Sequence, residues 1–206
     1  MKKFYLMPIA ALAVLLLGGC GYQADESTLY IEKNKIVSLD IEDFDEERYD
    51  KDELTAYVEE MIASCTAEQG EESVKLKKLK VKNGTATLLI EYADTEAYAG
   101  LIGEPLFSGT VEEAVEQGYA FDGDFARVDG SELTACGIDE LLMSGKTGKY
   151  RVVILEEPVA VQVSGKVRYL STSHTELLDR DQVRISADTV SQDAEDASVY
   201  TYIIYK

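Results

Sequence analysis

The chain of 206 residues has no tryptophan, three prolines and a single histidine, His174. One histidine excludes histidine-rich metal sites and leaves one imidazole base for a serine or cysteine triad. His174 lies in the polar stretch Ser171 to Thr175, and no Gly-x-Ser-x-Gly elbow accompanies it. The pattern is typical of a surface-loop histidine without a catalytic role.

Basic residues are also scarce, at 20 against 39 acidic ones, for a formal net charge of −19. Proteins bind nucleic acid by replacing the counterions of its phosphates with lysine and arginine, so no nucleic-acid partner is expected. The same charge argues against an electrostatic attachment to anionic lipid. An acidic surface is typical of a protein that must stay soluble.

Long hydrophobic runs are missing, since none reaches the ~20 residues that a spanning helix needs. The apolar segment from Met7 to Leu17 follows Lys2 and Lys3 and ends at Leu17-Gly18-Gly19-Cys20. Positive charge, a short apolar core and a small-residue cleavage site together predict an export signal.

The Leu-Gly-Gly-Cys motif resembles the lipobox of bacterial lipoproteins. The resemblance covers residues 1–20 and implies that 1–19 are a signal peptide and that Cys20 receives diacylglycerol and palmitate. It also implies that the chain is anchored to the extracytoplasmic face of the cell membrane. The whole chain bears a general likeness to uncharacterised lipoproteins of Gram-positive bacteria, which implies no activity.

Loss of the two signal lysines would leave 18 basic and 39 acidic residues, a formal charge of −21. The acyl chains on Cys20 are therefore expected to be the only membrane attachment. Residues 20–27 are short and polar and predict a lipidated tether, which leads to a single extracytoplasmic domain at 28–206.

Two further cysteines, Cys65 and Cys136, stand in apolar sequence. Outside the cytoplasm they could form one disulfide across a long loop. Buried free thiols are the favoured interpretation, because small apolar positions suit cysteine. The disulfide stays open, since the separation of the two Cα atoms decides it.

The N-terminal half of the domain predicts a hairpin, a helix and a second hairpin, an α+β layer in which the helix covers a sheet face. Alternation in the first hairpin places Val37 and Leu39 on one face and Ser38 and Asp40 on the polar opposite face. The predicted elements are a hairpin within 28–44, a helix from Asp50 or Asp52 to Gln69, and strands 74–82 and 85–92 joined by Asn83-Gly84, with a bulge near Lys77-Lys78.

The C-terminal half predicts short helices followed by strands, so the fold class is α+β with a β-rich C-terminal part. Pro158 should interrupt any central strand that contains it. Residues 150–206 could form a β-rich subdomain of the single domain. The predicted helices are 95–102 and 110–117, and the predicted strands are 150–155, 159–163, 166–170, 182–185 and 199–205.

Asp122, Asp124 and Asp129 recur beside Gly123 and Gly130 and are the candidate metal ligands, for calcium. Their spacing does not fit an EF-hand loop, and a solvated acidic turn is the alternative. The thirteen tyrosines are compatible with a sugar- or peptide-binding face. Tyr200 and Tyr202, however, belong to a strand that is apolar on both sides, which favours the core.

Two function classes remain open. The first is a noncatalytic binding or scaffolding module of the cell envelope, with no cofactor and with an unknown protein or glycan as partner. The alternative is a small envelope hydrolase that uses acidic residues or a Cys/His dyad. We expect the first, because no residue constellation in the sequence meets the requirements of a catalytic site.

Overall fold

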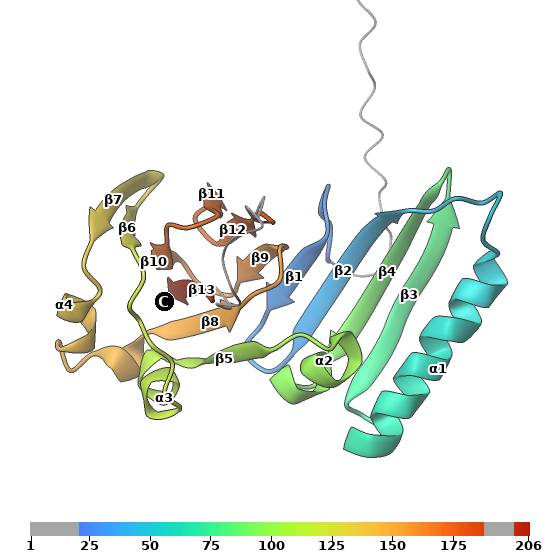
Figure 1. Cartoon of the computed structure of the whole chain (residues 1–206), viewed down its shortest axis with the longest axis horizontal. Coiled ribbons are helices and arrows are strands. Elements are labelled where there is room, and N and C mark those ends of the chain that lie inside the picture. The colour runs from blue at the N-terminus through green and yellow to red at the C-terminus, as the bar shows by residue number, and fades with distance from the viewer. Residues whose placement is uncertain (1–20, 188–199) are drawn as a thin grey trace, which may run out of the picture.

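The computed structural model describes residues 21–187 and 200–206, which contain two β-sheets and four α-helices (Figure 1). The predicted α+β class is confirmed. The signal segment, Cys20 and the acidic stretch 188–196 lie outside the described residues. No helix in the described ranges combines the length and hydrophobicity needed to cross a membrane.

The helices are α1 (Lys51–Gln69), α2 (Thr95–Ile102), α3 (Val111–Glu116) and α4 (Asp139–Leu142), with a 3₁₀ turn at Thr147–Lys149. The strands are β1 (Thr28–Ile31), β2 (Ile36–Asp43), β3 (Val74–Lys82), β4 (Thr85–Tyr92), β5 (Leu106–Thr110), β6 (Phe125–Asp129), β7 (Glu132–Cys136), β8 (Arg151–Leu155), β9 (Ala160–Val163), β10 (Val167–Ser171), β11 (Thr175–Asp179), β12 (Gln182–Ile185) and β13 (Thr201–Tyr205).

The seven-stranded sheet has the order β11-β12-β9-β1-β2-β4-β3. Its β3–β4 hairpin agrees with the prediction in detail. Asn83 and Gly84 both have positive φ, 53° and 74°, as a two-residue hairpin turn of this kind requires. Val81 pairs with Ala86, and the register shifts after Leu76, where the bulge was expected.

The six-stranded sheet has the order β5-β8-β13-β10-β6-β7, and all its neighbours are antiparallel. Strands β5, β6 and β7 had no signal in the sequence. Strand β7 is exposed along almost its whole length, so no apolar alternation marks it. Strand β5 carries a glycine, Gly109, which weakens any strand pattern.

The strands of residues 150–206 are divided between the two sheets instead of forming a unit of their own. Strands β9, β11 and β12 belong to the seven-stranded sheet, and β8, β10 and β13 to the six-stranded sheet. Strand β9 pairs in parallel with β1, from the other end of the chain. The turn at Ser164 and Gly165 therefore crosses from one sheet to the other.

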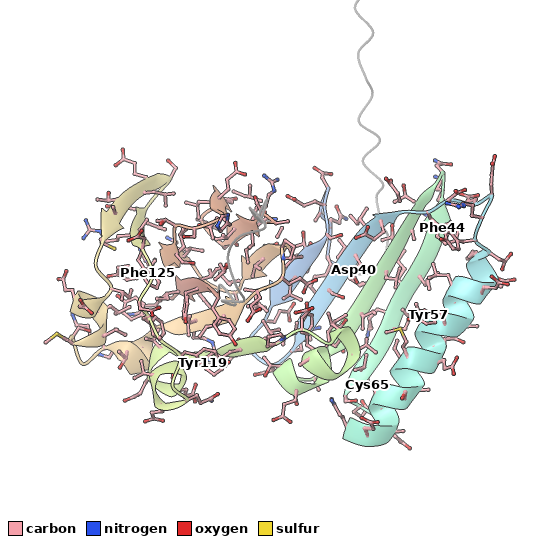
Figure 2. The ribbon with its side chains drawn as sticks, in the orientation of Figure 1. Asp40, Phe44, Tyr57, Cys65, Tyr119 and Phe125 are labelled. Carbon is pink, nitrogen blue, oxygen red and sulfur yellow. The ribbon has the colours of Figure 1, made fainter. Side chains whose placement is uncertain are left out.

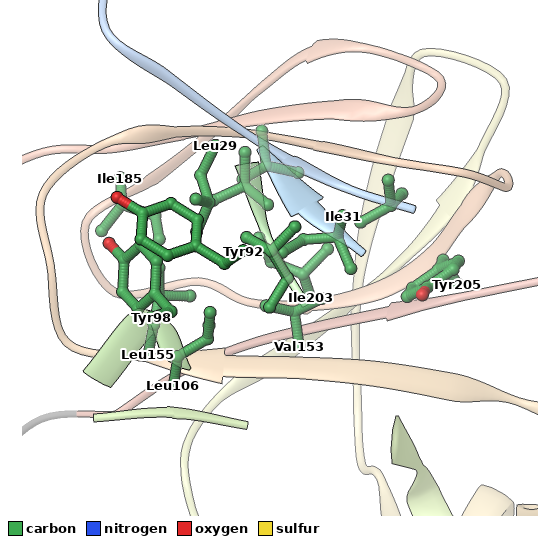
Figure 3. Close-up of a cluster of buried hydrophobic side chains, with 14 of the residues drawn as sticks. Leu29, Ile31, Tyr92, Tyr98, Leu106, Val153, Leu155, Ile185, Ile203 and Tyr205 are labelled. Carbon is green, nitrogen blue, oxygen red and sulfur yellow. The ribbon is translucent and has the colours of Figure 1, made fainter. Parts of the chain in front are cut away.

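The main core lies between the two sheets, where Leu29 and Ile31 of β1 belong to the same buried cluster as Val153 and Ile203 (Figure 3). At the β3 edge of the seven-stranded sheet, helix α1 lies along β3 and presents Cys65 to this core. Asp50 caps α1 by accepting hydrogen bonds from the backbone N–H groups of residues 52 and 53, and the helix ends before Gly70.

The outer face of the seven-stranded sheet is covered by the segment that precedes it. Tyr22 and Ala24 pack on the cluster formed by Tyr30, Val37 and its neighbours, and the backbone N–H of residue 41 donates to Ser27 Oγ at 2.9 Å. The polar composition of residues 21–27 predicts a tether. In the structure this segment instead packs on the domain.

Candidate functional site

An open hollow of about 610 Å³ is the site where sequence candidates meet. It lies at the end of β10 and the start of β13, and the connection that follows α3 lines it. Asp122 and Asp124, both predicted metal ligands, border it. The hollow is lined by Gln117, Gly118, Tyr119, Ala120, Asp122, Gly123, Asp124, Ser171, Ser173, Tyr200 and Tyr202.

Hydrogen bonds fix the three segments of this hollow to one another. The hydroxyl of Tyr202 donates to the carbonyl of Ala120, and the backbone N–H of Tyr202 donates to Ser171 Oγ at 3.0 Å. The backbone N–H of Thr172 donates to the carbonyl of Asp124 at 2.9 Å. The loop that carries the two carboxylates is thus held on the ends of two sheet strands.

Aromatic rings form the wall of the hollow. Tyr119 makes an edge contact with Tyr200, with ring centroids 5.7 Å apart, and packs on Phe107 at 5.1 Å; Figure 2 shows Tyr119 near α3. Burial raises the pKa of Tyr119, and burial followed by the charge of Asp122 raises the pKa of Tyr202 to about 12. These two hydroxyls are therefore neutral at physiological pH.

The lining contains two carboxylates and no basic side chain, so the hollow attracts positive charge. Tyrosine faces add to this, since a ring face attracts a cation within about 6 Å. Tyr202 is in the core, as predicted, whereas Tyr200 is only half-buried and reaches the hollow. The sequence did not single out Tyr119, which precedes the two acids by only a few residues.

The third candidate metal ligand is elsewhere. Asp129 ends β6 and borders a different hollow with Arg127 and Tyr150, whereas Asp124 precedes the start of the same strand. The structure therefore brings Asp122 and Asp124 to one hollow and leaves Asp129 outside it. Within the described ranges, no group of three or more His, Cys, Asp or Glu side chains is arranged to hold a metal ion.

The remaining candidates do not converge either. Cys65 and Cys136 are free thiols on α1 and β7, which lie at opposite ends of the molecule (Figures 1 and 2). Burial, followed by the charge of Glu68, raises the pKa of the Cys65 thiol, which lowers its reactivity. His174 lies in the turn between β10 and β11, with a φ of 60°.

A second polar group lies in the interior. Ser38, expected on a solvated face, is buried and Asp40 is half-buried. Ser38 Oγ donates to Asp40 Oδ2 at 2.9 Å and lies 3.3 Å from the Tyr92 hydroxyl. Tyr98 of α2 donates from its hydroxyl to Glu157. Burial of its carboxyl, then the nearby charge of Glu157, raises the pKa of Asp40 to about 6.

Comparison with known proteins adds no relative to this picture. No protein-family model matches the chain, and neither a curated protein nor a solved structure matches it.

Proposed function

We propose that the chain is a lipid-anchored, extracytoplasmic binding module of the cell envelope, noncatalytic, with Cys20 as its anchor. The export signal and lipobox at residues 1–20 support the anchor and the location. The hollow between Tyr119, Tyr200 and the two aspartates is its ligand-binding face.

The charge of the hollow is the observation that carries this proposal. Two carboxylates, at Asp122 and Asp124, stand beside tyrosine rings with no lining base to neutralise them. A bound neutral group would remove water from these carboxylates. The loss of their hydration without a compensating partner costs free energy. A cation offsets that cost and also contacts the ring faces.

The ligand class that fits is a positively charged group, such as the lysine and arginine side chains of another envelope protein. A glycan, the other expected partner class, gains nothing from the acidic lining. The hydrolase alternative has no comparable observation among the described residues in its favour.

Binding of a fluorescent oligolysine peptide, followed by anisotropy, tests the proposal. We expect Asp122→Asn with Asp124→Asn to weaken binding roughly tenfold, because an exposed charge pair contributes up to ~1 kcal/mol. The matched control is Glu59→Gln with Glu60→Gln on the exposed side of α1, which changes the net charge equally.

Two results would overturn the assignment. Equal weakening by both double variants would mean that the peptide senses only net charge. Binding of a neutral oligosaccharide, with no binding of the peptide, would mean that the hollow takes glycans.

A further inference from the structure

A second hollow, of about 1020 Å³, lies at the other end of β10 and β13. Its charge is opposite to that of the whole chain. Five basic side chains and two acidic ones line it: Lys33, Lys166, Arg168, Arg180 and Lys206, with Glu32 and Asp181. In a chain with nearly twice as many acids as bases, this hollow carries a local excess of positive charge.

Backbone hydrogen bonds bring these bases together from four parts of the chain. Residues 166 and 206 exchange N–H to carbonyl bonds of 2.9 Å in both directions, and the N–H of Val167 donates to the carbonyl of Arg180 at 2.8 Å. The N–H of Ser164 donates to the carbonyl of Ile31 at 3.1 Å, which brings in the turn with Lys33. The basic lining is thus built by the fold and not by loose loops.

Internal ion pairs do not neutralise these five bases within the described residues, whereas three bases outside the hollow, Lys35, Lys75 and Arg184, are paired. Lys35 lies 2.8 Å from Glu91, and Arg184 lies 2.6 Å from Glu26. All five lining bases are exposed. The one ring contact is that of Lys206, whose Nζ lies 5.2 Å from the centroid of Tyr150. The positive charge therefore remains available to a ligand.

The hollow also adjoins the anchor. Gly21, Tyr22 and Gln23 line it, and Gly21 directly follows Cys20. Tyr22 is held in place, because its ring makes an edge contact with Tyr30 at 4.9 Å and its hydroxyl donates to Glu32. One residue spans at most ~3.6 Å, so an acylated Cys20 would place the hollow at the bilayer surface.

We propose that this basic hollow binds the phosphate groups of anionic lipids in the bilayer that holds the anchor, an inference that rests on the proposed function. Phosphate oxygens are strong acceptors for arginine and lysine. The large negative charge elsewhere does not prevent this contact, since charges beyond ~10 Å are largely screened at 0.1 M salt. The domain would then have two membrane contacts, one covalent and one electrostatic.

Vesicle sedimentation of residues 20–206 carrying Cys20→Ser tests this contact without the acyl chains, and this segment contains every element of the fold. We expect binding to vesicles of phosphatidylcholine with phosphatidylglycerol and none to phosphatidylcholine alone. Lys166→Gln with Arg168→Gln should weaken binding roughly 25-fold, because each base near an anionic surface contributes about fivefold. The matched control is Lys77→Gln with Lys82→Gln on β3, at the far edge of the other sheet.

Equal binding to both vesicle types, or equal weakening by the hollow and control variants, would overturn the proposal. Titration with inorganic phosphate distinguishes a lipid headgroup from a soluble phosphate ligand. Binding of phosphate without any preference for anionic vesicles would assign a soluble ligand instead. Lipid labelling of the unmodified chain is scored separately. Vesicle preference without labelling would refute the anchor alone, and labelling without vesicle preference would refute the headgroup site alone.

Discussion

The two hollows lie at opposite ends of the same antiparallel pair of strands, β10 and β13, and carry opposite charge. At about 3.4 Å per residue, a five-residue strand separates its ends by roughly 17 Å. One end collects bases beside Gly21, the residue after the proposed anchor, and the other collects carboxylates and tyrosines. The net charge of the chain therefore describes this surface poorly, because the fold gathers basic side chains at one hollow and acidic side chains at the other.

This arrangement gives the proposed module a direction. If the basic end lies on the bilayer, the acidic end points outward, where an envelope partner can reach it. The packed segment 21–27 would fix this direction, since Arg184 holds Glu26 at 2.6 Å and leaves little free chain between the proposed anchor and the sheet. A flexible tether would have allowed any orientation.

Removal of the anchor should have the largest effect on this arrangement. Cys20→Ser is expected to abolish lipid labelling and to release the chain from cell membranes, because the thiol is the proposed site of acylation. Membrane fractionation with labelled palmitate measures both effects. Cys65→Ser is the control and should stay labelled and membrane-bound, and full membrane retention of Cys20→Ser would identify the apolar segment as the anchor.

The interior carboxyl belongs to neither hollow and should respond to pH on its own. The pKa of Asp40 is raised to about 6 in the folded state, so the folded protein holds this proton more tightly than the unfolded chain. The stabilisation is complete below the unfolded pKa, near 4, and is lost as the pH rises through 6. Asp40→Asn should therefore match the wild type in stability near pH 4 and exceed it by up to about 3 kcal/mol at pH 7.

Urea unfolding at a series of pH values measures this difference. Asp43→Asn, at the exposed end of the same strand, is the matched control and should not produce it. A difference between wild type and Asp40→Asn that does not change between pH 4 and pH 7 would contradict the assignment.

A methyl group at Gly165 should disturb the basic end and spare the acidic end. A Cβ atom there would lie 2.8 Å from the carbonyl carbon of Lys206 and 3.0 Å from its oxygen. Gly165→Ala is expected to cost about 1–3 kcal/mol in thermal unfolding and to weaken anionic vesicle binding. Gly123→Ala, in the acidic hollow, meets no atom within 4 Å and should have no effect on either measurement.

The smallest expected effect concerns the helix that leads into the acidic end. Thr110 caps α3, since its hydroxyl accepts from the backbone N–H of Glu113 at 3.1 Å while the Glu113 carboxylate accepts from the N–H of Thr110 at 2.7 Å. Thr110→Ala should cost about 1 kcal/mol of unfolding free energy in urea. Glu116→Ala, at the other end of the helix and exposed, should cost less, and equal losses would argue against the cap.

Local chemistry made some elements predictable. The Asn83-Gly84 hairpin, the cap at Asp50 and the end of α1 at Gly70 depend on turn and capping residues whose preferences act over a few residues. The strands β5 and β7 could not be predicted in this way. Strand β7 is exposed and exists because β6 offers it a pairing edge, which leaves no apolar pattern in its own residues.

The candidate sites divide in the same manner. Asp122 and Asp124 are two residues apart, so their shared hollow could be anticipated. The burial of the Asp40 carboxyl could not be anticipated. Alternation along β2 predicts a solvated face for Asp40, and the segments that bury this face, with Tyr98 and Glu157, are far away in the chain. The basic lining had no signal at all, since Lys33, Lys166 and Lys206 are distant in sequence.

The sequence by itself determined the excess of acid and the secondary structure of the N-terminal half, and it alone motivates the proposed anchor at Cys20, because each depends on composition or on neighbours within a few residues. Only the tertiary structure decided where charge accumulates. The parallel pairing of β1 with β9 and the crossing at Gly165 bring bases from four distant segments to one end of β10 and β13. Contacts between segments so far apart leave no local pattern for a sequence to display.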